Sequence, residues 1–451
     1  MDRRISDTTP KYLAIAAGFA DLIRSGDLPA GTRLPPQRQL ALERGVDLTT
    51  VTRAYTELKR MGLVEGRPGS GSFVRAAVAA AGGSAGFDLS MNVPPQPAGL
   101  GEGIAEGIAK LLATPGGISP LTYQPAGGVP RDRAAAARWL GRRLGRLEQD
   151  RVIVAAGVQS ALFALMDLLL GPGDSLACAA LTYPGLKTIA AQRGLRLVGL
   201  AQDAEGLDPA AFEDLCRATP PKALYLVPTI GNPTTATLPP ARRQAIVATA
   251  RRHGVALVED DAYGALAEAA PPPLAVLAPE ITWHLATLSK CATPALRIAY
   301  VAAPDPHAAL RLAAGLRAVS LMASPLTAAL ATQWIDDGTL DALTAAIQAE
   351  NQARQRLAAT LLPAGAVTAN PDGNHLWLTL PAGFGRASFV AAAREAGLLV
   401  VASDAFDVTG AAPEAVRLSL GGVPDRAALR HALTLLADLL RRPAVAAPAI
   451  V

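Results

Sequence analysis

The segment Thr287-Leu-Ser-Lys-Cys-Ala-Thr-Pro-Ala-Leu-Arg297 lies between two apolar runs with the pattern of strands. Burying a lysine between strands is costly unless its amine takes part in a reaction or pairs with another group. Lys290 has hydroxyl groups close by, at Thr287 and Ser289, and a guanidinium seven residues on, at Arg297. An amine, hydroxyls that contact phosphate and a guanidinium that clamps it suit pyridoxal phosphate. A lysine and an arginine on an ordinary surface loop would give the same segment, so the surrounding sequence has to decide.

Upstream of this segment, four apolar runs with the pattern of strands alternate with helical patterns. The runs cover 151–155, 175–178, 223–227 and 255–259. Strand, loop and helix in repetition predict an α/β domain built on a mostly parallel sheet that helices cover on both faces. Ligand groups in such sheets gather in the loops after the carboxyl ends of the strands, and polar residues of this chain fall there.

These loops carry a group for each part of pyridoxal phosphate. In chain order they are Gly157, Val158, Gln159, Tyr183, Asn232, Asp260 and Tyr263. The glycine opens a helix, whose N–H groups and positive dipole end can hold the phosphate. The first tyrosine can stack on the ring, the asparagine and second tyrosine can bind the ring oxygen, and the aspartate can pair with the protonated ring nitrogen. Each residue alone is equally well explained as part of a turn, a strand end or the core, but together they favour a cofactor site.

The composition allows a large core and excludes several classes of protein. Half of the 451 residues are hydrophobic, yet no uncharged apolar run reaches the roughly 20 residues of a membrane span, and no signal segment follows the N-terminus. Cys178, Cys216 and Cys291 lie far apart, without CxxC spacing, and the five histidines form no ligand-spaced pair. These features predict a reduced cytoplasmic protein without a membrane partner, a disulfide framework or a metal site.

The excess positive charge is confined to the N-terminal part of the chain. Residues 1–78 hold 12 Lys and Arg against 8 Asp and Glu, whereas the other 373 residues hold 30 of each kind. The net charge of +4 therefore comes from residues 1–78. This distribution suggests a nucleic-acid-binding head on a neutral body.

Residues 1–78, termed the head, have the pattern of a winged helix-turn-helix domain. The expected elements are helices over 12–24, 37–44 and 48–61 and hairpin strands over 63–65 and 72–75. Thr49 and Thr50, at the start of the third helix, can reach base edges or phosphates in a major groove. Arg38 and Arg67 can bind the phosphate backbone. A small helical cap with solvated arginines is the alternative.

Three motifs of the head carry a family resemblance. They are Ser25-Gly-Asp-Leu-Pro-Ala-Gly-Thr-Arg-Leu-Pro-Pro-Gln-Arg-Gln-Leu-Ala41, Leu48-Thr-Thr-Val-Thr-Arg-Ala-Tyr55, and Gly62-Leu-Val64 with Gly69-Ser-Gly-Ser-Phe-Val74. With these motifs the head resembles the GntR superfamily of regulators, which often has a basic residue at the position of Leu48. The resemblance implies that the head binds an operator in double-stranded DNA.

A segment without charge or apolar anchors follows the head. Residues 76–86 read Ala-Ala-Val-Ala-Ala-Ala-Gly-Gly-Ser-Ala-Gly, a composition typical of a flexible tether. We therefore expect a winged helix-turn-helix domain over 1–78, a flexible linker over 79–88 and a large domain over 89–451.

With Lys290 and the strand-end residues in place, the region from 87 to about 440 resembles fold-type I pyridoxal-phosphate-dependent aminotransferases. The resemblance implies that Lys290 bonds covalently to the cofactor. It assigns Asp260 to the ring nitrogen, Asn232 and Tyr263 to the ring oxygen, Tyr183 to stacking, and Thr287, Ser289, Arg297, Gly157, Val158 and Gln159 to the phosphate. Tyr123 matches a tyrosine that these proteins lend to the phosphate of a neighbouring subunit. Arg417 matches the arginine that binds the α-carboxylate of an amino acid.

A winged-helix head fused to such a body resembles the MocR-type regulators of the GntR superfamily. This resemblance implies a cytoplasmic, homodimeric transcription regulator that senses pyridoxal phosphate, an amine or an amino acid. The alternative is an active aminotransferase with a DNA-binding head, since the lysine, the aspartate and the carboxylate-binding arginine are all present. The head favours the regulator, because a metabolic enzyme has no need of a recognition helix. A residual transamination half-reaction stays open.

Overall fold

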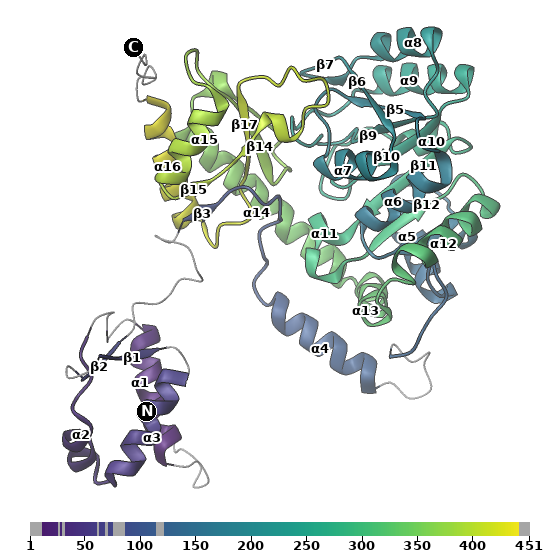
Figure 1. Cartoon of the computed structure of the whole chain (residues 1–451). Helices are drawn as coiled ribbons and strands as arrows, with labels where there is room; N and C mark the ends of the chain where they lie inside the picture. The colour runs from purple at the N-terminus through teal and green to yellow at the C-terminus, as the bar shows by residue number, and fades with distance from the viewer. Residues whose placement is uncertain are drawn as a thin grey trace. The chain divides into compact units, whose positions relative to one another are not determined.

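The computed structural model describes residues 11–25, 28, 32–60, 63–67, 71–74, 86–113 and 121–441. The chain divides into two compact units, residues 1–85 and 86–451, whose elements are labelled in Figure 1. Within the described ranges no helix is long and apolar enough to cross a membrane.

In the part of the smaller unit that the structure describes, three helices and a β-hairpin follow one another in the predicted order. Its elements are α1 (Lys11–Ser25), α2 (Gln37–Arg44), α3 (Leu48–Arg60), β1 (Val64–Arg67) and β2 (Gly71–Val74). Strands β1 and β2 pair antiparallel, with Val64 opposite Val74. Gly45 ends α2 at a φ of 57°, a left-handed conformation that glycine adopts without strain. The chain can therefore turn directly from α2 into α3.

Helix α3 divides its side chains between the core and solvent. Val51, Tyr55 and Leu58 are buried, and they pack with side chains from the other elements of the smaller unit. Their spacing is that of one helix face. Thr49 lies exposed on the same helix. The hydrophobic pattern thus determines which face of α3 is free to meet a partner.

The larger unit is built on a seven-stranded sheet with the strand order β4-β12-β11-β10-β9-β5-β6. Its strands are β4 (Val152–Ala155), β5 (Ser175–Ala179), β6 (Arg196–Leu200), β9 (Ala223–Leu226), β10 (Ala256–Asp260), β11 (Thr282–Thr287) and β12 (Ala299–Ala302). Only β12 is antiparallel to its neighbours, β11 and β4; the other pairs are parallel. The predicted α/β fold with a mostly parallel sheet is confirmed.

Helices cover both faces of this sheet (Figure 1). They are α5 (Pro130–Leu144), α6 (Val158–Leu169), α7 (Pro184–Arg193), α8 (Pro209–Ala218), α9 (Pro240–His253), α10 (Leu274–Leu277), α11 (Leu288–Cys291), α12 (Pro306–Ser320) and α13 (Pro325–Asp336). Helix α4 (Leu100–Ala113) packs against α13 instead. Along β4, Val152 and Val154 pack with α5 and α13, whereas Ile153 and Ala155 pack with α6 and α12. This alternation follows from the two-residue period of a strand.

A second, antiparallel sheet with the order β13-β14-β17-β16 completes the larger unit. Its strands and helices are β13 (Val367–Ala369), β14 (His375–Thr379), β16 (Val401–Ala402), β17 (Ala415–Ser419), α14 (Thr339–Leu361), α15 (Arg386–Glu395) and α16 (Arg426–Arg441). Three helices and this sheet share one hydrophobic core. Two short ribbons pair β7 (Gln202–Asp203) with β8 (Gly206–Leu207) and β3 (Phe87–Asp88) with β15 (Leu398–Leu399).

Strand β3 (Phe87–Asp88) falls within the last residues of the predicted linker, 79–88. Phe87 and Asp88 form β3, and the N–H of Phe87 donates to the carbonyl oxygen of Gly397 at 2.7 Å. The family resemblance begins at residue 87, so it overlaps the linker boundary at these two residues, and a strand this short shows no periodic pattern of its own. Residues 79–85 of the predicted linker lie outside the described residues.

Candidate functional site

A cavity of about 350 Å³ opens where the parallel strands of the large sheet end. Among the predicted site residues, its lining includes Val158, Gln159, Tyr183, Asn232, Asp260, Tyr263, Thr287, Ser289, Lys290, Arg297 and Arg417. We term it the strand-end cavity. Arg417 reaches it from β17 of the second sheet, whereas the other residues come from the large sheet and its loops. The fold therefore brings together residues that the sequence analysis collected from separate motifs.

Lys290 lies in α11, directly after β11. Its ammonium group donates to the backbone oxygen of Asn92. Burial and the positive charges of Arg417 and Arg297 lower the pKa of Lys290 to about 8, against the opposing effect of Asp260. The neutral amine, which is the nucleophilic form, is therefore accessible close to physiological pH.

Asp260, at the end of β10, presents a carboxylate with one unpaired oxygen. The hydroxyl of Tyr225 donates to Oδ2 of Asp260 at 2.8 Å, while Oδ1 is buried and has no partner in the described part of the chain. Burial is the main reason why the pKa of Asp260 is raised to about 6. A protonated ring nitrogen would satisfy Oδ1 and offset the cost of burying the charge. The sequence analysis did not single out Tyr225, although it falls in the predicted run 223–227.

Residues that follow β3 contact both Arg417 and Tyr263, and Asn232, after β9, also contacts Arg417. Arg417 Nη1 donates to Asn232 Oδ1 at 3.1 Å, and Nη2 donates to the backbone oxygen of Ser90. The hydroxyl of Tyr263 accepts from Asn92 Nδ2 at 2.8 Å. Arg417 Nε and Asn92 Oδ1 are buried and meet no partner among the described residues. A donor and an acceptor thus remain for a ligand. No sequence pattern predicted that Ser90 and Asn92 would contact site residues.

Gly157 and Arg297 meet at the N-terminus of α6. Gly157 has a φ of 84°, and a Cβ atom there would lie 2.8 Å from Arg297 Nη2, so glycine keeps this approach open. The first-turn N–H groups of α6 lack acceptors within the helix. Across from them, the Thr287 hydroxyl donates to the Ser289 hydroxyl at 3.1 Å. Free N–H groups, hydroxyls and a guanidinium at one place suit a phosphate.

Two predicted cofactor residues are not in the lining of the strand-end cavity: Gly157, which lies against the lining residue Arg297, and Tyr123. The Tyr123 side chain is 83% exposed, and it lies in the loop before α5. Its predicted contact with the phosphate of a neighbouring subunit stays a prediction.

The predicted DNA-contacting residues lie on the surface of the smaller unit. Arg38 and Thr50 line an open groove together with Lys11 and Leu48, and Thr49 is exposed beside it. Lys11 adds a cation that the sequence analysis had not named. The backbone of Arg67 belongs to β1, but its side chain lies outside the described residues.

Two family models match the chain. The model for aminotransferase class I and II matches residues 87–436, and that for bacterial regulatory proteins of the gntR family matches residues 11–74. YdeF of Bacillus subtilis, an uncharacterized HTH-type transcriptional regulator, is 28% identical and covers 96% of this chain and 94% of its own length. TauR of Rhodobacter capsulatus, an HTH-type transcriptional regulator, is 30% identical, with 81% of each chain covered.

The larger unit is also similar to a solved aminotransferase. LysN, the α-aminoadipate aminotransferase of Thermus thermophilus complexed with N-(5'-phosphopyridoxyl)-L-leucine, superimposes with a TM-score of 0.71. It is 26% identical, and the match covers 79% of this chain and 92% of that one.

The strand-end cavity fits pyridoxal phosphate, which is the cofactor of this protein. Its ring nitrogen can pair with the unpaired oxygen of Asp260. Its aldehyde needs a nucleophilic amine, which Lys290 offers because its pKa is lowered. Its phosphate needs a cation, which is the guanidinium beside Gly157. The chain belongs to the aminotransferase class I and II family and, because a gntR-family domain precedes that body, to the MocR-type transcriptional regulators of the GntR superfamily.

Proposed function

We propose that the protein regulates transcription in the cytoplasm by binding operator DNA through its head and an amino acid or amine in its strand-end cavity. The observation that carries this proposal is a gntR-family domain in the same chain as a cavity lined by both Lys290 and Arg417. The complete cavity also keeps a transamination half-reaction chemically feasible, which is the specific support for the aminotransferase alternative.

When bound, pyridoxal phosphate supplies an aldehyde for attachment to amines and an electron-withdrawing ring. Lys290 would form the covalent attachment, and Asp260 would keep a proton on the ring nitrogen. The remaining assignments are Tyr183 to the ring face, Asn232 and Tyr263 to the ring oxygen, and Thr287, Ser289, Arg297 and the 157–159 turn to the phosphate. All these residues border one cavity, which supports assigning them to one ligand.

Arg417 would bind the carboxylate of an amino-acid effector. Its side chain is buried, and Nε is unpaired in the described structure. The cations in the cavity lining are Lys290, Arg297 and Arg417, and the first two would serve the cofactor. Because no further cation in the described part of this chain lines the cavity, we propose an effector whose side chain carries no negative charge.

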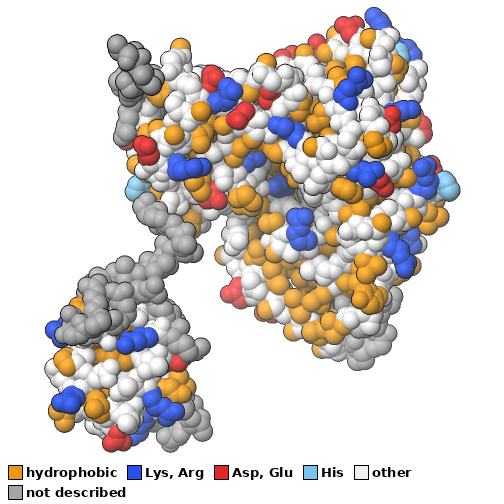
Figure 2. Space-filling view, in the orientation of Figure 1, with side chains coloured by type: hydrophobic (Ala, Val, Ile, Leu, Met, Phe, Trp, Pro, Cys, Tyr) orange, Lys and Arg blue, Asp and Glu red, His pale blue; other side chains and the backbone are white. Residues whose placement is uncertain are grey.

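We further propose that two copies of the chain associate through the face that carries Tyr123. Figure 2 shows hydrophobic side chains gathered where Figure 1 labels α4 and α13. Leu112, Leu121 and Leu321 are exposed hydrophobic residues, as is Tyr123, and a contact between Gln124 N–H and the sulfur of Met322 joins two of their loops. Concentrated exposed apolar side chains mark interaction surfaces. A dimer would present two heads to two half-sites, so their binding would be reinforced.

A footprinting experiment tests this function. The full-length protein loaded with pyridoxal phosphate is expected to protect two half-sites in the DNA upstream of its own gene. Adding an amino acid with an uncharged side chain should change the DNA affinity of the loaded protein and leave that of the cofactor-free protein unchanged, because an effector shifts only the state that binds it differently. Protection of one half-site would contradict the dimer. Absence of protection, with turnover at about 1–1000 per second, would establish the aminotransferase instead.

The double variant Thr49→Ala, Thr50→Ala is expected to lose roughly 1–3 kcal/mol of sequence-specific DNA binding, because these hydroxyls begin the helix that would enter the major groove. Fluorescence anisotropy with the operator and with a scrambled duplex measures this loss. Arg38→Ala should weaken binding to both duplexes alike. Thr56→Ala, which removes an exposed hydroxyl further along α3, is the matched control. Unchanged discrimination in the double variant would show that another segment reads the bases.

A further inference from the structure

A second cavity, of about 600 Å³, lies beside α5 and strand β11. We term it the α5 cavity. Asp261 lines it, whereas the preceding residue, Asp260, lines the strand-end cavity, because successive side chains of an extended chain point to opposite faces. Trp139, Leu144 and Val276 contribute apolar walls. Its volume falls within the range of small-molecule sites, about 300–1000 Å³.

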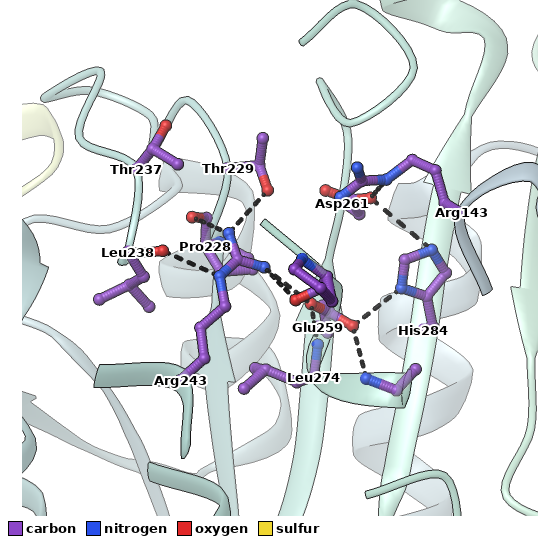
Figure 3. A network of polar contacts seen from close by, with 12 residues as sticks. Arg143, Pro228, Thr229, Thr237, Leu238, Arg243, Glu259, Asp261, Leu274 and His284 are labelled. Atoms are coloured by element: carbon purple, nitrogen blue, oxygen red, sulfur yellow. Dashed lines mark hydrogen bonds and ion pairs between the residues drawn. The ribbon is translucent and has the colours of Figure 1, made fainter. Parts of the chain in front are cut away.

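A buried chain of charged groups fixes one wall of the α5 cavity. Figure 3 shows Glu259 between Arg243 and His284, and Asp261 between His284 and Arg143. Glu259 Oε2 contacts His284 Nδ1 at 2.9 Å, and His284 Nε2 lies 3.9 Å from Asp261 Oδ2. Arg143 Nε donates to the same Asp261 oxygen at 2.8 Å. Asp261 and Arg143 are therefore held in place before any ligand arrives.

This ion pair leaves one acceptor and one donor unused. Asp261 Oδ1 and Arg143 Nη2 are buried, and neither has a hydrogen-bond partner in the ranges that the structure describes. The Asp261 side chain is only 1% exposed. Buried polar atoms without partners are unfavourable, so their presence at a cavity wall points to a ligand that satisfies both. The described residues contain no cluster of three or more His, Cys, Asp or Glu side chains suited to a metal ion.

We propose that the α5 cavity binds a small uncharged molecule with a carboxamide-like edge and an apolar body. Its N–H would donate to Asp261 Oδ1, and its C=O would accept from Arg143 Nη2. The charged residues that line the cavity have both signs, Asp261, Glu268 and Asp341 against Arg142 and Arg143, so a ligand with a net charge of either sign would meet a like charge. This site goes beyond the sensing of an effector in the strand-end cavity, and it does not depend on that function.

Three probes of nearly equal shape test the proposal on the full-length protein loaded with pyridoxal phosphate. Benzamide offers one donor and one acceptor, benzoate offers two acceptors, and benzamidine offers two donors. Isothermal titration should show benzamide binding at least about tenfold more tightly than either of the others, which is the effect of one unmatched buried hydrogen bond. Val276→Trp, which fills the cavity from an exposed helix position, should abolish this binding. The difference between the binding heats of the parent protein and of this variant is then the signal of the α5 cavity.

Asp261→Asn should reverse the preference of the site. The asparagine oxygen can accept from Arg143, which leaves its NH₂ group facing the ligand, so benzoate should now bind about tenfold more tightly than benzamide. Asp203→Asn is the matched control, because it alters an Arg–Asp pair on the surface, with Arg242, and should leave the preference unchanged. Binding of all three probes with equal affinity would overturn the proposal. So would the absence of any binding that Val276→Trp removes, which is also the result expected if a second copy of the chain fills the cavity.

Discussion

Lys290→Ala is expected to abolish the covalent attachment of pyridoxal phosphate. Lys290 is the lysine of the strand-end cavity, and burial with two neighbouring guanidiniums gives it a pKa of about 8, so its amine is available for the reaction. After borohydride reduction, mass spectrometry should locate the cofactor on the peptide that contains Lys290 in the parent protein. The variant should carry none and should lack the visible absorption of the attached cofactor.

The pH dependence of attachment provides a second measurement. The neutral amine reacts, and its fraction rises as pH approaches the pKa from below. With a pKa of about 8 for Lys290, the attachment rate to cofactor-free protein should rise about tenfold per pH unit below that value and level off above it. A rate that keeps rising to about pH 10, the range of an ordinary lysine, would contradict the lowered pKa.

Lys187→Ala is the matched control for Lys290→Ala. Lys187 belongs to the same unit, but its ammonium donates to the backbone oxygens of Asp404 and Ala405, and it does not line the strand-end cavity. The Lys187→Ala variant should keep full covalent attachment of pyridoxal phosphate. Covalent cofactor on any lysine other than Lys290 would refute the assignment of this residue.

The fold was predictable because its signals are periodic or repeat along the chain. The runs at 151–155, 175–178, 223–227 and 255–259 are continuous apolar segments, as expected of strands that are covered on both faces, and they form β4, β5, β9 and β10. The loops after them were also predictable as ligand-bearing loops, because the ends of parallel strands share one edge of the sheet.

Other parts of the site depend on contacts between segments that are distant in sequence. Asn92 follows the two-residue strand β3, which pairs with β15, and it contacts Tyr263, a residue 171 positions further along the chain. Tyr225 reads as an ordinary strand residue until its hydroxyl is seen on Asp260. Neither has a local pattern. The buried network of Glu259 and Asp261 could not be predicted for another reason. A carboxylate at the end of a strand is usually exposed to solvent, so the sequence gives no sign that these two are buried.

Glu259→Gln is expected to destabilise the larger unit by about 3–5 kcal/mol, the usual cost of removing one partner from a buried ion pair. Glu259 and Arg243 are both fully buried, with Oε1 and Nη1 3.8 Å apart, and the Glu259 carboxylate also accepts from the N–H groups of Leu274 and Ala275. All four tryptophans, at 139, 283, 334 and 377, lie in this unit, so urea unfolding followed by tryptophan fluorescence reports on it alone.

Glu280→Gln is the matched control, because Glu280 pairs with Arg251 on the surface at 2.6 Å and exposed pairs contribute little to stability. Equal effects of the two substitutions would show that the Glu259 network does not stabilise the fold.

The cost of Glu259→Gln should also depend on pH. Burial acts against both charges, but their mutual contact dominates: the pKa of Glu259 is lowered and that of His284 is raised. The contribution of Glu259 is present above the unfolded carboxylate pKa of about 4.3, and that of His284 is present below the unfolded imidazole pKa of about 6.5 and is lost as pH rises through the folded value. The two overlap between these limits, so the variant should lose more stability at about pH 6 than at about pH 9. An equal loss at both values would mean that His284 keeps one protonation state across this range, so that its titration does not modulate the contribution of Glu259.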